Sequence, residues 1–244
     1  MVNRRSNLKI VNLESLTKNL NNLIFGIHCI LIVLLNLGAI RLGRSAMIAT
    51  IAVYGILANL FVLKQVTLFG LQVTSADPFI IGISLGLNLL QENFDKKSAK
   101  TALWTGFWCL IAYTILSQIQ LGYTPNSFDI SHVHFNAILS LSPRLTVAAL
   151  CSYFVSQSWE LWFYSYLKNK LPNWFTLRNW ISIGSSQLID TVLFSLIGLA
   201  GLGYNLWHII GFSYIIKIAA MLIATSLVTL LKSHFKPCPI FDLN

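Results

Sequence analysis

Seven long apolar runs divide this chain, and they constrain its fold more than any other feature. They cover residues 20–40, 46–63, 78–92, 102–120, 143–167, 179–201 and 206–231. A helix needs about 20 apolar residues to cross a bilayer, so most of these runs are long enough. Only 10% of the residues are charged, whereas a soluble domain carries about 25%. The sequence therefore predicts an all-α integral membrane protein, a compact bundle of about seven transmembrane helices.

The basic residues stand in short clusters between the runs, although the net charge is +9. The clusters are Arg41/Arg44, Lys96/Lys97/Lys100, Lys168/Lys170/Arg178 and Lys232/Lys236. A nucleic-acid surface gathers its charges on one face, whereas topology determinants lie in short cytoplasmic loops. We therefore expect these loops and the C-terminus in the cytoplasm, residues 121–134 outside, and no nucleic-acid partner. Seven spans then place the N-terminus outside, which conflicts with the four basic residues among the first 18.

Two segments between the runs have their own local signals. The segment Lys64–Pro78 is too short to cross, and its alternation of apolar residues such as Val66 and Leu68 predicts an extended hairpin or a re-entrant piece. Such backbone must be buried in protein or face water. Ser142-Pro143 is typical of a helix start, and residues 135–141 suit an interfacial lead-in.

Polar side chains inside the apolar runs are the candidates for function. A charged side chain at the bilayer centre costs about 2.5–3.5 kcal/mol on insertion scales, so it needs a partner, a cavity or a substrate. The candidates are Asn59, Asn88, Gln91, Glu92, Arg144, Gln157, Glu160, Gln187, Asp190 and Lys217. Asn59 and Asn88 also suit interhelical hydrogen bonds. Glu92 also suits the cytoplasmic interface, and Arg144 an anchor at the outer boundary.

Asp190 is the most informative of these residues. Gln187, three residues earlier, shares its helix face, and Ser186 lies beside it at i,i+4. At 1.5 Å per residue, Asp190 and Lys217 each lie about 18 Å into their helices. Both therefore fall near the middle of a core about 30 Å thick. We expect an ion pair or two poles of one site, with a purely structural pair as the alternative.

Gln157 and Glu160 form a second polar face, which we place in the cytoplasmic third of the membrane. Aromatic residues such as Trp159 stand beside it. A carboxylate accepts two adjacent donors in one plane. Carboxylates and amides beside aromatic rings therefore favour a planar heterocycle with paired N–H donors.

No pattern indicates an enzyme, a cofactor or a metal. His132 and His134 form an H-x-H pair without further ligands, and there is no Walker motif. The four cysteines have no C-x-x-C spacing, so neither a zinc site nor a disulfide framework is expected.

The polar residues belong to an ordered set of short motifs. These are Y-G-I-L-A-N at 54–59, K-Q-V-T-L-F-G-L at 64–71, G-L-N-L-L-Q-E-N-F-D-K-K at 86–97, P-R at 143–144, S-Q-S-W-E at 156–160, S-Q-L-I-D-T at 186–191 and Y-I-I-K at 214–217. In this order, over about residues 50–232, the chain resembles the queuosine precursor transporter family, also called the vitamin uptake transporter family. The resemblance implies a six-span core and uptake of a 7-deazaguanine base across the bacterial inner membrane for making queuosine in tRNA.

The resemblance also implies a set of substrate-binding positions. The matching residues are Asn59, Glu92, Arg144, Gln157, Glu160, Gln187, Asp190 and Lys217. We hypothesise that Asp190 and Gln187 read the edge of the base, with Glu160 and Gln157 as a second wall and Lys217 balancing charge. Asn88, Ser186 and Trp159 complete the candidate set.

The chain departs from the family pattern at three positions. Asn88 stands where an aspartate is usual, Asp95 where glycine is frequent, and Glu160 in place of an aspartate. These departures leave preQ0, preQ1 and queuine open as the substrate. The coupling ion and the oligomeric state are open too, although Glu160 and Asp190 are compatible with proton coupling.

The resulting hypothesis is an inner-membrane importer of a queuosine precursor. The alternatives are a substrate-binding membrane subunit of an ATP-driven uptake system and a structural membrane protein that does not transport. The expected organisation is a polar basic segment at 1–19, an extra N-terminal transmembrane helix at 20–45, a transporter core at 46–232 and a cytoplasmic tail at 233–244.

Overall fold

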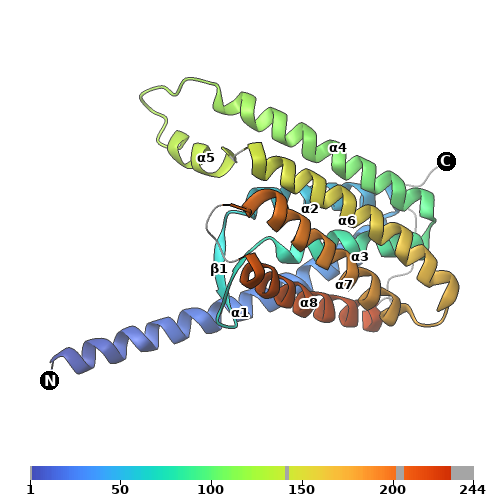
Figure 1. The fold of residues 1–244 in the computed structure, drawn as a ribbon, viewed down its shortest axis with the longest axis horizontal. Coiled ribbons are helices and arrows are strands. Elements are labelled where there is room, and N and C mark those ends of the chain that lie inside the picture. The colour runs from blue at the N-terminus through green and yellow to red at the C-terminus, as the bar shows by residue number, and fades with distance from the viewer. Residues whose placement is uncertain (1, 141–142, 202–205, 232–244) are drawn as a thin grey trace.

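A bundle of helices with a small hairpin at one end forms the fold (Figure 1). The computed structural model describes residues 2–140, 143–201 and 206–231, with side chains from residue 19 onward except at positions 143 and 199. The elements are α1 (Val2–Leu42), α2 (Arg44–Phe61), β1 (Gln65–Leu68), β2 (Leu71–Thr74), α3 (Asp77–Asn93), α4 (Lys96–Leu121), α5 (His132–Leu139), α6 (Pro143–Lys170), α7 (Phe175–Phe194), the π-helical turn η1 (Ser195–Leu199) and α8 (Leu206–Leu231).

The helices have the length and composition of membrane spans. Within the described residues, five are long and apolar enough to cross a bilayer: Asn19–Leu42 in α1, α2, α4, α7 with η1, and α8. The pair α5 and α6 adds a sixth if it forms one span. Helix α3 has only 17 residues, a length of about 26 Å, and most of its residues are buried inside the bundle. The expected all-α membrane bundle is confirmed, and α3 is the internal helix that corresponds to the shortest apolar run.

Helix α1 runs without a break from Val2 to Leu42. The polar segment expected at 1–19 contains neither glycine nor proline, so nothing in it stops a helix. Its N-terminal half extends away from the bundle (Figure 1). Only Gly43 separates α1 from α2, and its φ of 116° lies in a region that L side chains rarely adopt. This glycine therefore allows the chain to reverse within one residue.

The hairpin expected in the segment 64–78 is confirmed. Strands β1 and β2 pair antiparallel around Phe69 and Gly70, whose positive φ angles of 51° and 84° are typical of a type I′ turn. Helix α1 holds this hairpin through two side chains. The Asn21 Nδ2 donates to Thr67 O at 3.3 Å, and the backbone N–H of Phe69 donates to the Asn22 Oδ1 at 2.9 Å.

Helix α3 packs against α1 and α2 through two glycines. A Cβ at Gly82 would lie 2.6 Å from the Ile32 Cγ2, and one at Gly86 would lie 2.8 Å from the Met47 Cε. These distances are too short for a side chain, so both positions allow close helix approach. The opposite face of α3 is consequently turned toward α6 and α7, where its polar residues lie.

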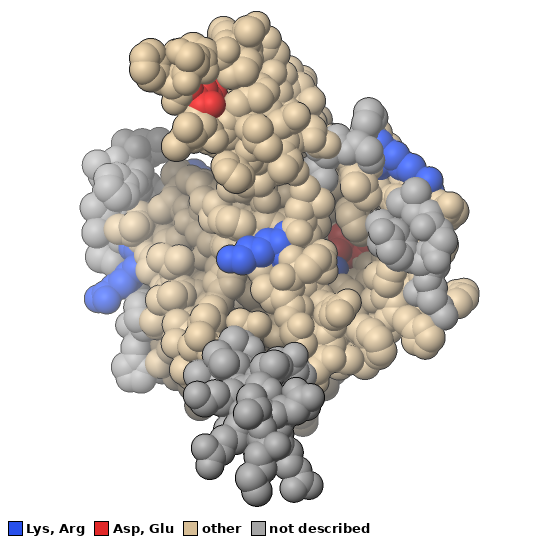
Figure 2. All heavy atoms as spheres, turned by 90° about the vertical axis from the view of Figure 1, so that its left-hand side faces the viewer, with Lys and Arg blue, Asp and Glu red and all other residues tan. Residues whose placement is uncertain are grey.

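The two ends of the bundle differ in charge. The α1–α2, α3–α4 and α6–α7 connections share one end, here called the basic end, while α5 and the hairpin lie at the other (Figure 1). The basic clusters at 41–44, 96–100 and 168–178 flank these three connections; the cluster at 232–236 lies outside the described residues. The hairpin end shows mostly uncharged side chains (Figure 2). Among the connections between helices this asymmetry matches the predicted topology, whereas the N-terminal segment with four basic residues extends from the hairpin end (Figure 1). The membrane side of each end stays a prediction.

Candidate functional site

Buried polar side chains form a line through the core between α3, α6 and α7. We call this line the polar column, and its members are Ser84, Asn88, Gln157, Glu160, Asn179, Ser182, Ser186 and Gln187. On each helix the members recur at spacings of three or four residues, at 84/88, 157/160 and 179/182/186, so that they share one helix face, and Gln187 lies next to Ser186. Every member is buried. Helices that are otherwise apolar thus present their polar faces to one another.

Glu160 lies at the centre of the column and is fully buried. One carboxylate oxygen accepts from the Asn88 Nδ2 at 2.9 Å, and the other accepts from the Ser186 Oγ at 2.5 Å. The Asn88 Nδ2 also lies 3.0 Å from the Asn179 Oδ1 and 3.3 Å from the Ser182 Oγ. Within the described residues Glu160 has no cationic partner. Neutral donors alone therefore hold this carboxyl group in place.

The column also contains acceptors that have no donor. The Ser84 Oγ donates to the Gln157 Oε1 at 3.3 Å and accepts from the Gln187 Nε2 at 3.2 Å. The Gln187 Oε1 and the Asn88 Oδ1 are buried and have no hydrogen-bond partner in the described part of the chain. An unpaired buried acceptor costs about 1–3 kcal/mol. A ligand with N–H donors would satisfy these oxygens.

Asp190 and Lys217 form a buried ion pair toward the hairpin end. The Lys217 Nζ lies 2.7 Å from the Asp190 Oδ2 and 3.1 Å from the Thr191 Oγ1. The Asp190 side chain is 11% exposed and the Lys217 side chain 4%. The ion pair expected from helix depth is confirmed. The Asp190 carboxylate is therefore already neutralised by Lys217, whereas the Glu160 carboxyl group has no ion-pair partner among the described residues.

Glu92 is held at the basic end by an ion-pair network. Its Oε1 lies 2.7 Å from the Arg178 Nη2 and 3.7 Å from the Lys168 Nζ, and it accepts from the Tyr164 hydroxyl at 2.9 Å. Arg178 is almost fully buried and its Nη1 also donates to Leu171 O at 2.8 Å. The position of Glu92 fits the interface expected for it. Arg178, which the sequence indicated only as a topology determinant, joins α3 to the α6–α7 connection.

A cavity of about 290 Å³ opens beside this network. Its lining residues are Gln91, Phe94, Asp95, Lys96, Ser165, Lys168 and Asn169. Asp95 in this lining is the N-cap of α4, and its Oδ1 accepts from the Ser98 N at 2.5 Å. Hydrogen bonds from the Ser98 backbone and side chain hold the pKa of Asp95 below its ordinary value. The aspartate at this position, unusual for the family resemblance, is therefore explained by helix capping.

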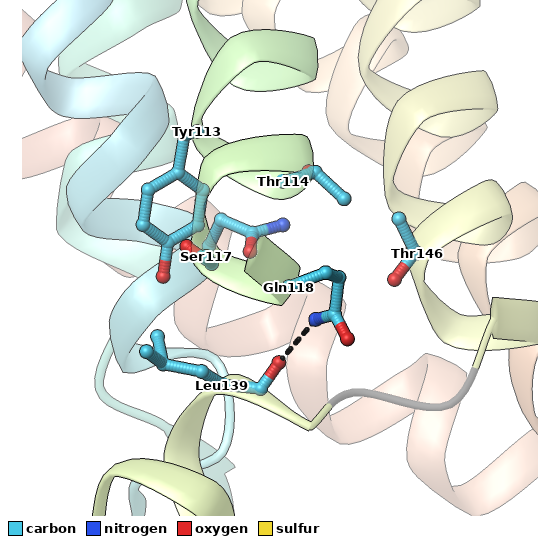
Figure 3. Close-up of a pocket in the computed structure, with 7 residues that line it drawn as sticks. Tyr113, Thr114, Ser117, Gln118, Leu139 and Thr146 are labelled. Atoms are coloured by element: carbon cyan, nitrogen blue, oxygen red, sulfur yellow. Dashed lines mark hydrogen bonds between the residues drawn. The ribbon is translucent and has the colours of Figure 1, made fainter. Parts of the chain in front are cut away.

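Asn59 lies outside the polar column. It lines a small hollow near α5, of about 10 Å³, which is enough for about one water. The Gln118 Nε2 donates to Leu139 O across this hollow at 2.9 Å (Figure 3). The other lining residues are Tyr113, Thr114, Ser117 and Thr146. Asn59 is thus placed among neutral polar groups and apart from Glu160.

Arg144 and Trp159 also lie outside the column. The Arg144 Nε donates to Ile197 O and its Nη2 donates to Ala200 O, both at 2.6 Å. These bonds satisfy carbonyls at the end of η1, which fits the anchoring alternative. The Trp159 Nε1 donates to the Ser185 Oγ at 3.1 Å, while its ring packs against Trp162 on the partly exposed side of α6.

Asp77 is the residue that sequence reasoning missed. It is fully buried, and neither carboxylate oxygen has a hydrogen-bond partner within the described residues. It interacts electrostatically with Lys217 and Asp190. In the sequence it lies within the segment 64–78, where a hairpin or a re-entrant piece was expected. The signal that marks it is Pro78 directly after it, because proline at the first turn and an acidic residue are both typical of a helix start.

Two comparisons with known proteins bear on the chain. Residues 78–231 match the family model described as "Putative vitamin uptake transporter". Over 204 residues the chain is 32% identical to the "Probable queuosine precursor transporter" of Bacillus subtilis (strain 168), a match that covers 81% of this chain and 87% of that relative. The chain belongs to the vitamin uptake transporter family. No solved structure matches it.

Membership of this family confirms the resemblance found in the motifs. All eight residues of the polar column, together with Asp190 and Lys217, fall within the matched segment. Asn59 and Asp77 precede it.

Proposed function

We propose that this family member imports a queuosine precursor, a 7-deazaguanine base, across the bacterial inner membrane, with its basic end in the cytoplasm. The printed name of the Bacillus subtilis relative supports the substrate class. The membrane bundle and the charge asymmetry of its two ends support the orientation. The observation that carries the proposal is a buried carboxyl group beside two unpaired amide oxygens in the polar column.

Glu160 is the residue that reads the base in this proposal. A deazaguanine presents a ring N–H and an exocyclic amino group side by side, and a carboxylate accepts both in one plane. The present donors to Glu160 are the neutral groups of Asn88 and Ser186. They can yield to a base because its N–H groups replace neutral donors to the same carboxylate, so that no ion pair has to be broken. The unpaired Gln187 Oε1 and Asn88 Oδ1 then accept further N–H groups of the base.

The two ion-paired ends of the column act as gates in this proposal. The Asp190–Lys217 pair lies toward the hairpin end, and the Glu92–Arg178 pair lies toward the basic end. Alternating access requires that one end open while the other stays closed around a central site. In this assignment Asp190 and Lys217 gate the entry of the base, and they do not read its edge.

Uptake of labelled preQ0, preQ1 and queuine tests the function, in cells that lack both their own importer and queuosine precursor synthesis. We expect accumulation with the natural chain, loss with Glu160→Gln, and normal accumulation with Asp129→Asn, an exposed carboxylate in the segment before α5. Uptake by Glu160→Gln equal to that of the natural chain would remove Glu160 from the site.

The same uptake by the purified chain in vesicles separates an importer from a subunit of an ATP-driven system. An importer accumulates the base without added ATPase subunits. If uptake appears only when such subunits and ATP are supplied, the chain is the substrate-binding subunit instead.

A further inference from the structure

Asp77, Asp190 and Lys217 lie at similar distances from the basic ends of their helices and interact electrostatically, and we call them the acid–lysine trio. Asp77 is 16 residues from the end of α3 at Asn93, and Asp190 is 15 residues from the start of α7 at Phe175. At 1.5 Å per residue these positions are about 24 and 22 Å from the basic end. Lys217, which is 14 residues before Leu231, is about 21 Å from the same end.

Within the trio, Lys217 has an N–H donor and Asp77 has acceptor oxygens that are not used in the described contacts. The Lys217 ammonium has three N–H donors, and it uses two of them on the Asp190 Oδ2 and the Thr191 Oγ1. Asp77 has two carboxylate oxygens without a partner in the described residues, and it interacts electrostatically with Lys217. Lys217 therefore has a second carboxyl group available to it besides the one that it contacts.

Among the side chains that the structure describes, the other helices packed against α3 place no second cation beside Asp77. Helix α1 contributes Cys29, which interacts electrostatically with Asp77, and His28, whose ring packs on Phe79. Helix α2 contributes Tyr54, also against Phe79. Helix α6 contributes Glu160, which contacts Asn88 about three helical turns nearer the basic end. The lysines of α4 flank the basic end itself.

Charge counting then sets the protonation state of the trio. Two ionised carboxylates against one ammonium leave a net negative charge in a site without water contact at Asp77. An unpaired buried charge is strongly disfavoured. One proton on the carboxyl group that Lys217 does not contact makes the trio neutral. In the arrangement observed, that proton belongs on Asp77, because Lys217 is paired with Asp190.

We propose that Asp77 and Asp190 alternate as the partner of Lys217, and that this alternation carries one proton inward with each base. The inference rests on the proposed import function. Asp190, whose side chain is 11% exposed, takes a proton from the outer side and forms an O–H bond. Lys217 keeps its three hydrogens and moves to Asp77, whose O–H bond breaks and whose proton leaves to the cytoplasmic side. Transfer of the proton from Asp190 to Asp77, with return of the ammonium to Asp190, resets the trio.

Vesicles that contain the purified full-length chain test this inference with preQ1 as the probe. With one proton per base, an inward gradient of one pH unit supports about tenfold accumulation, because one pH unit corresponds to about 1.4 kcal/mol. A protonophore abolishes that accumulation. If a sodium gradient drives accumulation and a pH gradient does not, the inference is overturned.

The variant Asp77→Asn separates coupling from binding. We expect it to exchange labelled for unlabelled preQ1 at the natural rate and to lose accumulation driven by the pH gradient. Asp129→Asn, an exposed acid of the same type, should keep both activities. Accumulation by Asp77→Asn equal to that of the natural chain refutes the role of Asp77.

Exchange by the natural chain distinguishes this inference from the proposed function. If the natural chain neither binds nor exchanges preQ1, preQ0 or queuine, the proposed function is wrong. If it exchanges a base and a pH gradient has no effect on accumulation, only the proton-coupling inference is wrong. A pH-sensitive dye inside the vesicles reports proton entry with the base in the natural chain, so the conclusion does not depend on the folding of any variant.

Discussion

Removing the two partners of the buried ion pair should have unequal effects on stability. Lys217→Met leaves two carboxyl groups without a cation, whereas Asp190→Asn leaves Lys217 with the unpaired oxygens of Asp77 as a replacement partner. At 2.7 Å and an effective dielectric constant of about 20, the attraction between Lys217 and Asp190 is about 6 kcal/mol before desolvation. Breaking such a buried pair costs about 3–5 kcal/mol net.

The expected free energies of unfolding follow from that difference. Lys217→Met should lose about 3–5 kcal/mol, and Asp190→Asn about 1 kcal/mol or less, because the ammonium is re-paired. The double variant Asp77→Asn/Asp190→Asn removes both carboxylates and leaves the ammonium alone, so that its loss should approach that of Lys217→Met. The two single aspartate variants should therefore be strongly non-additive.

Reversible unfolding in detergent or lipid, followed by tryptophan fluorescence, measures these values. Asp129→Asn serves as the control for removal of a carboxylate. It should leave stability nearly unchanged, since the residue is exposed and the asparagine oxygen can accept the same backbone N–H groups of Ser131 and His132. Equal losses for Lys217→Met and Asp190→Asn, together with additive losses for the two aspartate variants, would show that Asp77 does not reach Lys217. That result would also remove the basis for the alternation proposed above.

Three further predictions concern the basic end and the helix connections. Arg178→Gln should lose about 3–5 kcal/mol of stability, because Glu92 loses the buried guanidinium that it contacts at 2.7 Å. Lys168→Ala should lose less than about 1 kcal/mol, because Lys168 is half-exposed and 3.7 Å from Glu92. Thermal unfolding of the two variants measures the difference. Gly43→Ala should lower stability by about 1–2 kcal/mol, because its positive φ is strained for an L side chain, while Gly26→Ala, in open space on α1, should be neutral or slightly stabilising. Asp95→Ala should be less stable than the natural chain at neutral pH, and the difference should vanish on acidification. The pKa of Asp95 is lowered on folding, so its contribution is present above the unfolded value near about 4 and is lost as pH falls through the folded value; unfolding midpoints from pH 7 down to about 3 measure this.

The helices, the hairpin and one ion pair could be predicted from the order of residues along the chain. Helix length follows from apolar runs, and the depth of a residue follows from its distance to the helix end, so the level shared by Asp190 and Lys217 was accessible. The alternation of residues 65–74 likewise predicted an extended hairpin. These features are local, and each depends on residues within one segment.

Tertiary packing decided which residues come together in the candidate site. Depth alone does not say which face of a helix meets which neighbour, and a rotation of about 100° per residue separates adjacent side chains. Close approach at Gly82 and Gly86 turns the opposite face of α3 toward α6 and α7, which brings Asn88 to Glu160. The same packing leaves Asn59 at a separate hollow and Trp159 on the outer side of α6.

Asp77 illustrates the difference most clearly. Along the chain it stands between a hairpin and a proline, where an aspartate is usually a solvated turn residue. In the folded protein α3 begins inside the bundle, so its first turn is enclosed by α1 and α8 and the carboxyl group loses contact with water. Residue spacing along α7 and α8 placed Asp190 and Lys217 at a similar depth, which made an ion pair between them an expected contact. Only the packing of several helices around the start of α3 brought a second carboxyl group to the same lysine.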